Sequence, residues 1–141
     1  MRFVSYEWPD KVEDDFANQI ALELKESRSP FDPLSGVRAV MLGISNEKAE
    51  GVRITLLVEG EQVLGYALYT VSEFKDIYVL QEHRNNRYAD KLLDEAKQWY
   101  RSNGTSEVEI TIASTEQARR FWEHRAIHGG MGESRLLIEE D

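Results

Sequence analysis

Apolar residues recur along the chain at two spacings, one typical of helices and one typical of strands. Apolar side chains at every third or fourth residue predict helices over residues 11–28, 37–45, 89–100 and 115–125. Alternating or continuous β-forming residues predict strands over residues 1–8, 52–58, 63–71, 74–80, 108–113 and 135–138. The predicted order is therefore β-α-α-β-β-β-α-β-α-β.

This order predicts an α/β (α+β) fold. Two β-rich runs flank the turn Glu59-Gly60-Glu61-Gln62, which is typical of an antiparallel hairpin. Strand–helix–strand units favour parallel pairs, so the sheet should be mixed but mostly antiparallel, with helices flanking it. Turns are predicted at 29–36 and 129–132, and no repeat or linker interrupts the chain. We therefore expect residues 1–141 to form one domain.

Composition excludes several classes of function. The 141 residues include 17 Lys and Arg against 26 Asp and Glu, which gives a formal net charge of −9. General nucleic-acid binding is not expected, because it depends on basic side chains that neutralise phosphates. The chain has no Cys, so disulfides, thiolate metal sites and thiol nucleophiles are excluded. No apolar run approaches the roughly 20 residues of a membrane span, and the start is no signal peptide, so a cytoplasmic protein is expected.

The stretch IYVLQEHRNNRYADKLL, residues 77–93, offers a candidate anion site. A strand there enters a short polar loop that opens into an amphipathic helix. The first amides of a helix have no intrahelical acceptor, and the helix dipole favours negative charge beside them. Arg84 and Arg87 add cationic donors. Solvated arginines in an ordinary strand–helix connection are the alternative interpretation of this stretch.

Three segments together resemble the GNAT superfamily of acyl-coenzyme A-dependent N-acyltransferases. VEGEQVLGYALY resembles the family hairpin. IYVLQEHRNNRYADKLL resembles its coenzyme segment, usually V-x-P-x-x-R-x-x-G-x-G/A followed by a Leu pair. TEQARRFWEHRAI resembles its second motif, usually N-x-x-A-x-x-F-Y-x-x-x-G-F, and its matching positions are Thr115, Ala118, Phe121 and Trp122.

The resemblance implies an N-acetyltransferase that uses acetyl-coenzyme A, or another acyl-coenzyme A, and transfers its acyl group directly to a primary amine. It implies that the backbone of Val79 and Leu80 binds pantetheine and that the following loop binds the pyrophosphate. The loop positions are Arg84, Asn85, Asn86, Arg87, Tyr88 and Ala89. The acceptor would be a small molecule or peptide amine, held by the first two helices and the loop between them.

The sequence departs from the family pattern at several positions. Gln81 replaces the usual Pro, and Arg87 replaces the first loop glycine. In the second motif Thr115 replaces Asn, Arg125-Ala126-Ile127 replaces Leu-Gly-Phe, and Trp122 replaces the Tyr often assigned as general acid. An indole cannot protonate a thiolate, although a thiol is a good leaving group near neutral pH. The departures therefore put catalysis in doubt more than fold.

Candidate catalytic side chains lie on the strand at 74–80 or just before it. Glu73 and Asp76 are candidate bases, and Tyr78 is a candidate acid that shares a face of the strand with Asp76. Ordinary strand-edge polarity is the alternative for all three. His124 and His128 are four residues apart, but the helix end near Arg125 and the lack of an HExxH pattern predict no metal site.

Two further hypotheses remain beside the enzyme. The departures in the second motif fit a catalytically degenerate GNAT-fold module for binding, regulation or assembly, a kind that also occurs among virus-encoded proteins. The motifs could also be coincidental in an unrelated α/β domain. A homodimer joined through edge strands or the last strand is plausible for any of these.

Charge is unevenly distributed along the chain. Basic residues outnumber acidic ones in 81–91 and 115–128, the segments that resemble the coenzyme-binding motifs. The net charge therefore does not argue against a locally basic phosphate site. The acidic remainder would attract a cationic acceptor.

Overall fold

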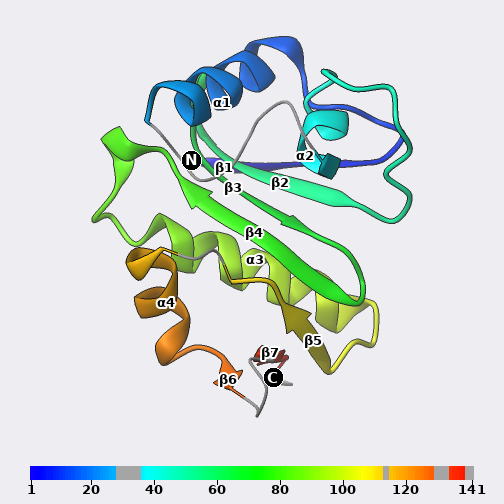
Figure 1. The fold of residues 1–141 in the computed structure, drawn as a ribbon, viewed down its shortest axis with the longest axis vertical. Coiled ribbons are helices and arrows are strands. Elements are labelled where there is room, and N and C mark those ends of the chain that lie inside the picture. Colours follow the sequence, from blue (N-terminus) through cyan, green and yellow to red (C-terminus); the bar gives the residue numbers. More distant parts are fainter. Residues whose placement is uncertain (28–35, 113–114, 129–133, 139–141) are drawn as a thin grey trace.

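The structure is a computed structural model that describes residues 1–27, 36–112, 115–128 and 134–138. Within these residues one seven-stranded sheet has the order β1-β2-β3-β4-β5-β7-β6 (Figure 1). The strands are β1 (Arg2–Glu7), β2 (Arg53–Glu59), β3 (Gln62–Tyr69), β4 (Glu73–Val79), β5 (Glu107–Ile110), β6 (Ile127–His128) and β7 (Ser134–Leu137). The helices are α1 (Asp14–Glu26), α2 (Gly36–Met41), α3 (Tyr88–Ser102), α4 (Glu116–Glu123) and the short 3-10 helix η1 (Gln81–His83).

The predicted α/β class and mixed sheet are confirmed. Strand pairs β1–β2, β2–β3, β3–β4, β5–β7 and β6–β7 are antiparallel, and β4–β5 is parallel. The predicted hairpin is β2–β3, which pairs Glu59 with Gln62. Strand β6 was not predicted, because two residues are too few to show an alternating pattern. It makes β7 an inner strand, so β1 and β6 are the edges.

Two helices are shorter than their apolar patterns predict. The first begins at Asp14 rather than residue 11. The N–H of Val12 donates to the carbonyl of Met41 over 2.9 Å, which attaches the segment before α1 to the end of α2. Val12 is therefore buried in line with the apolar face of α1 although it is not part of the helix. Helix α2 ends at Met41, just before Gly43, which has φ +77°. Residues 29–35, 113 and 129–132 lie outside the described residues, so the loop, strand end and turn predicted there are not described.

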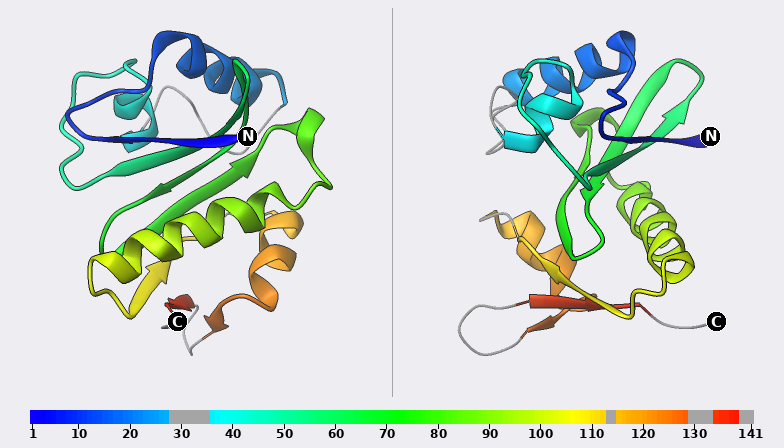
Figure 2. Two further views of the ribbon diagram at one scale, coloured as in Figure 1. Left: turned by 180° about the vertical axis from the view of Figure 1, so that it is seen from behind. Right: turned by 90° about the vertical axis from the view of Figure 1, so that its right-hand side faces the viewer.

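Buried side chains form two groups that contact different helices. One group includes Phe16, Ile20 and Leu24 of α1 and Val40 and Met41 of α2. The other includes Leu92 and Tyr100 of α3 and Trp122 of α4. In the side view, α1 and α2 lie together at one end, and α3 and α4 lie on either side of β4 (Figure 2). No helix in the described part of the chain is long and apolar enough to cross a membrane.

Gly65 lies where β3, β4 and α3 approach most closely. A Cβ at this position would lie 2.7 Å from the carbonyl oxygen of Tyr78 and 3.1 Å from Cδ1 of Leu92. The Tyr78 carbonyl is backbone and cannot rotate away. Glycine at this position therefore permits the close packing that positions the carboxyl end of β4.

We predict that Gly65→Ala destabilises the protein by about 1–3 kcal/mol, because the added methyl overpacks this contact. Urea unfolding measures the change. The matched control is Gln62→Ala, an exposed position at the start of the same strand, which should change stability by less than about 0.5 kcal/mol. A Gly65→Ala variant as stable as the control would contradict the prediction.

Candidate functional site

A bulge in β4 changes which face of the sheet its side chains occupy. Leu68 pairs with Asp76, but Tyr69 pairs with Phe74, so Lys75 is the extra residue on β4. Phe74, before the bulge, packs in the group contacted by α3 and α4. Tyr78, after the bulge, packs in the group contacted by α1 and α2. The bulge therefore re-aims the second half of the strand.

Beyond the bulge, one backbone edge of β4 is left open. Parallel pairing with β5 joins Glu73 to Glu109 and Phe74 to Ile110, and the Thr111 N–H donates to the Phe74 carbonyl over 3.0 Å. Among the described residues no further strand pair follows. The N–H of Leu80 donates to the carbonyl of Leu64 on β3 over 3.0 Å. Because peptide groups alternate sides along a strand, those of Ile77 and Val79 face the side that β5 has left.

The loop after β4 presents amides to the same end of the molecule. Asn85 and Arg87 both have positive φ, 71° and 60°. The first bond of α3 runs from the Lys91 N–H to the Arg87 carbonyl. The amides of Tyr88, Ala89 and Asp90 therefore have no acceptor within the helix, and the positive end of the helix dipole lies among them. The arrangement suits an anionic group.

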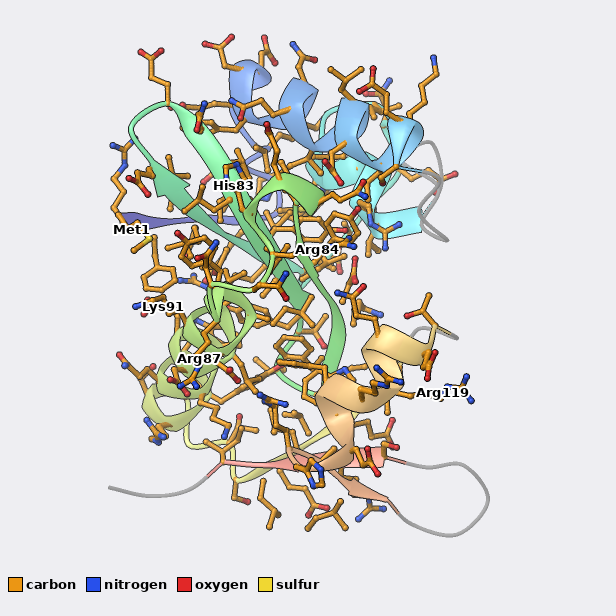
Figure 3. All side chains as sticks on the ribbon, turned by 90° about the vertical axis from the view of Figure 1, so that its left-hand side faces the viewer. Met1, His83, Arg84, Arg87, Lys91 and Arg119 are labelled. Carbon is orange, nitrogen blue, oxygen red and sulfur yellow. The ribbon has the colours of Figure 1, made fainter. Side chains whose placement is uncertain are left out.

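Basic side chains surround this helix start. Figure 3 shows His83, Arg84, Arg87 and Lys91 around the end of β4 and the start of α3, with Arg119 across from them on α4. Arg87 and Lys91 are exposed. The structure thus brings cations from the loop, α3 and α4 to one end of the open edge of β4, although the protein as a whole is acidic.

Arg84 lies along β4 rather than over the first turn of α3. Its Nε donates to the carbonyl of Val79 over 3.0 Å, and its Nη1 donates to Oε1 of Gln117 on α4 over 3.4 Å. Its guanidinium lies 5.2 Å from the centre of the Tyr78 ring. Arg84 therefore links the open end of β4 to α4. Sequence reasoning missed Gln117, because no local pattern marks a contact 33 residues apart.

Asp76 is buried in a polar network that sequence reasoning did not foresee. Its Oδ2 accepts from the hydroxyl of Tyr66 over 2.6 Å and from Nη2 of Arg38 over 3.0 Å. Nε of Arg38 also donates to the Tyr66 hydroxyl over 3.1 Å. Burial raises the pKa of Asp76, and the Arg38 charge and the hydrogen bonds oppose that rise. The network attaches α2 to β4 immediately after the bulge.

The other two catalytic candidates also have partners. Glu73 accepts from the hydroxyl of Thr111 and from Nζ of Lys75 over 3.0 Å, and these contacts hold its pKa below the ordinary value. The hydroxyl of Tyr78 donates to Oε2 of Glu23 over 2.7 Å. Burial raises the pKa of Tyr78. Glu23, a residue that the sequence did not single out, also accepts from the Gln81 N–H over 3.3 Å.

The second motif is mainly structural within α4. The hydroxyl of Thr115 accepts from the Ala118 N–H over 3.1 Å and caps the helix. Trp122 is 2% exposed and packs edge-on against Phe74 and Phe121. Its indole therefore lies in the core. Threonine at the usual Asn position still begins the helix, because both side chains can accept this bond.

The structure brings one set of predicted residues together and separates another. Residues 79–89 lie in one continuous strand end, loop and helix start. Asp76 and Tyr78 face α2 and α1, whereas Glu73 contacts Thr111, just after β5. Ile77 was not predicted as a site residue. Peptide groups two residues apart on a strand face the same edge, so the prediction for Val79 could have been extended to the backbone of Ile77.

The comparisons with known proteins concern both sequence and fold. The family model for the acetyltransferase (GNAT) family matches residues 6–126. No curated protein sequence matches significantly.

Solved structures of low sequence identity share the fold. A GNAT-family acetyltransferase from Staphylococcus aureus Mu50 is 15% identical, with a TM-score of 0.65 over 98% of this chain and 99% of that one. Ribosomal-protein-alanine N-acetyltransferase from Brucella melitensis is 14% identical, with a TM-score of 0.67 over 91% and 92%. PaiA N-acetyltransferase from Thermoplasma acidophilum, in complex with coenzyme A, is 10% identical, with a TM-score of 0.63 over 97% and 99%.

We predict that Tyr66→Phe destabilises the protein by about 1.5–3 kcal/mol at neutral pH, because it removes a hydrogen bond to a buried carboxylate. Without that bond the folded-state pKa of Asp76 rises further above its ordinary 3.8. The penalty should therefore be smallest at low pH, where Asp76 is protonated, and should grow as pH rises through the folded-state pKa.

Urea unfolding of both proteins across this pH range measures the effect. Tyr69→Phe is the matched control, because Tyr69 is also fully buried on β3 and its hydroxyl bonds to Thr55 and Arg53 rather than to a carboxylate. Its penalty should not depend on pH in this range. The same pH dependence in both variants would contradict the assignment to Asp76.

Proposed function

Because the chain belongs to the GNAT acetyltransferase family, we propose that it transfers an acetyl group from acetyl-coenzyme A to a primary amine. The observation that carries this proposal is the continuity between the open edge of β4 and the cationic start of α3. An extended chain that contains amides can pair with the open edge of β4 while its phosphates bind at the start of α3. Coenzyme A has both parts in that order.

The residues that would hold the coenzyme follow from this continuity. We propose that the peptide groups of Val79 and Leu80 border the pantetheine arm and that the loop from Arg84 to Ala89 binds the pyrophosphate. Three amides without intrahelical acceptors and the adjacent cations fit a group with several negative charges. The Val79 carbonyl is bonded to Arg84 in this structure, so pantetheine pairing there would displace that contact.

The proposed chemistry is attack by the free amine on the thioester carbonyl. The N–H of Ile77 faces the open side of β4 and would donate to the carbonyl oxygen, on which negative charge develops. Coenzyme A then leaves as its thiolate, and the amine nitrogen loses a proton. The acetyl carbon changes its bond from sulfur to nitrogen, so no oxidant or metal is required.

The reaction needs a base for the amine proton and an acid for the leaving thiolate, and the contacts of each candidate side chain decide which of these it could supply. Glu73 is a weak base because its contacts lower its pKa. Asp76 is enclosed by Arg38 and Tyr66, so we propose that it holds β4 rather than accepting the amine proton. Tyr78 is the remaining candidate acid. Its raised pKa keeps it protonated at neutral pH but makes it a weaker acid than a free phenol, and its hydroxyl already donates to Glu23.

A degenerate binding module is the second candidate function. Trp122 supports it, because the residue at the usual acid position has no dissociable proton near neutral pH and its indole is buried. Such a module would bind the coenzyme without turnover. Calorimetry with acetyl-coenzyme A, followed by thiol release with a panel of primary amines, separates the two. No binding up to millimolar concentration would refute both.

We predict that Arg87→Glu abolishes measurable binding of acetyl-coenzyme A, because it places a carboxylate at the start of α3 where the pyrophosphate is expected. Arg84→Glu, at the first position of the same proposed phosphate loop, should do the same. Calorimetric titration measures the affinity. Lys97→Glu makes the same charge change farther along α3 and should leave the affinity within about twofold. Wild-type affinity in Arg87→Glu would refute the proposed phosphate position.

We also predict that kcat/KM for a cationic amine falls as ionic strength rises, because the net charge of −9 attracts it over long range. Initial rates from about 0.02 to 0.5 M salt, at saturating acetyl-coenzyme A, measure this effect. A neutral amine of similar size serves as the control and should show a much smaller change. Equal salt dependence for both amines would contradict a cationic acceptor preference.

A further inference from the structure

We propose that Arg125 adjusts the affinity of the α3 start for anionic ligands by neutralising Asp90. This inference rests on the proposed coenzyme site and concerns two side chains that no family motif explains. Arg125 stands where the family usually has leucine. The ion pair that it forms crosses from the end of α4 to the first turn of α3.

Asp90 is an unfavourable residue for a phosphate site. It is the third residue of α3, and its own amide is one of the three without an acceptor in the helix. Side chains on a helix tilt toward its N-terminus, so this carboxylate lies over the turn that presents those amides. An isolated negative charge there would repel phosphate and compete with it for the positive end of the dipole.

Arg125 is held in the geometry that offsets this charge. Its Nε donates to Oδ1 of Asp90 over 2.8 Å and its Nη2 donates to Oδ2 over 3.2 Å. Its third nitrogen, Nη1, donates to the carbonyl of Phe121 over 2.6 Å. The guanidinium also lies 4.3 Å from the centre of the Phe121 ring. All three nitrogens are therefore engaged, and the paired, planar contact leaves little freedom to move.

The exposure of the pair argues for an electrostatic role rather than a stabilising one. The side chain of Arg125 is 33% exposed and that of Asp90 is 41% exposed. Ion pairs this open to solvent contribute little to stability. Their charges would still act on an anion bound at the start of α3, where Arg87 and Lys91 add attraction. The end of α4 thus sets the charge of the phosphate site on α3.

The two single variants separate this role from a purely structural one, because they change the local charge in opposite directions. We expect Arg125→Gln to weaken coenzyme A binding about three- to tenfold at low salt, because it leaves Asp90 unopposed. Asp90→Asn should tighten binding by a similar factor. The double variant restores the original charge and should bind within about twofold of the wild type. Calorimetry in about 0.02 M and 0.5 M salt measures all four, and high salt should reduce the differences.

Two controls test the location and the chemistry. Arg135→Gln and Glu107→Gln make the same charge changes in an ion pair between β7 and β5, and both should leave the affinity unchanged. Pantetheine, which lacks the phosphates, should bind all variants equally. Weaker binding in both single variants would show that the pair positions α3, and equal shifts in the control pair would show a general charge effect; either result overturns the proposal. Failure of the wild type to bind coenzyme A would instead refute the proposed function on which it rests.

Discussion

The early separation of β4 from β5 is the constraint on which the rest of the site depends. Parallel pairing stops after two residue pairs, and the bulge at Lys75 turns the remaining strand toward the other face. A strand edge inside a protein normally pairs with another strand, because unpaired peptide groups are costly when buried. Here the peptide group of Ile77 stays available for another partner, and the Val79 carbonyl is held by Arg84. The proposed pairing with pantetheine uses this edge.

Polar contacts hold that separated strand where hydrophobic packing alone would not specify its path. Arg38 and Tyr66 hold Asp76 after the bulge, and Glu23 binds both the Tyr78 hydroxyl and the Gln81 N–H at the strand end. Directional bonds fix rotation and register, which apolar contacts specify less sharply. The carboxylates of Asp76 and Glu23 thus explain the position of β4 better than they explain proton transfer.

The basic end of the molecule is built within an acidic protein by arranging a few charges. Cations come from the loop after η1, α3 and α4, and they gather where α3 begins (Figure 3). Asp90 is an acidic residue among them, and Arg125, just after α4, pairs with it. Local geometry rather than overall composition therefore determines whether an anionic ligand is attracted, because charges beyond roughly 10 Å are screened.

The sequence by itself determined the order of elements, the hairpin and the position of the strand, loop and helix that make up the candidate anion site, because these features depend on periodicity and on neighbouring residues. It also indicated Asp76, Glu73 and Tyr78 as titratable groups on one strand. Only the tertiary structure decided which contacts those groups make. Their partners Arg38, Thr111 and Glu23 lie 38 to 55 residues away along the chain. The bulge and the ion pair between Asp90 and Arg125 are likewise set by packing between distant segments, and no local pattern records them.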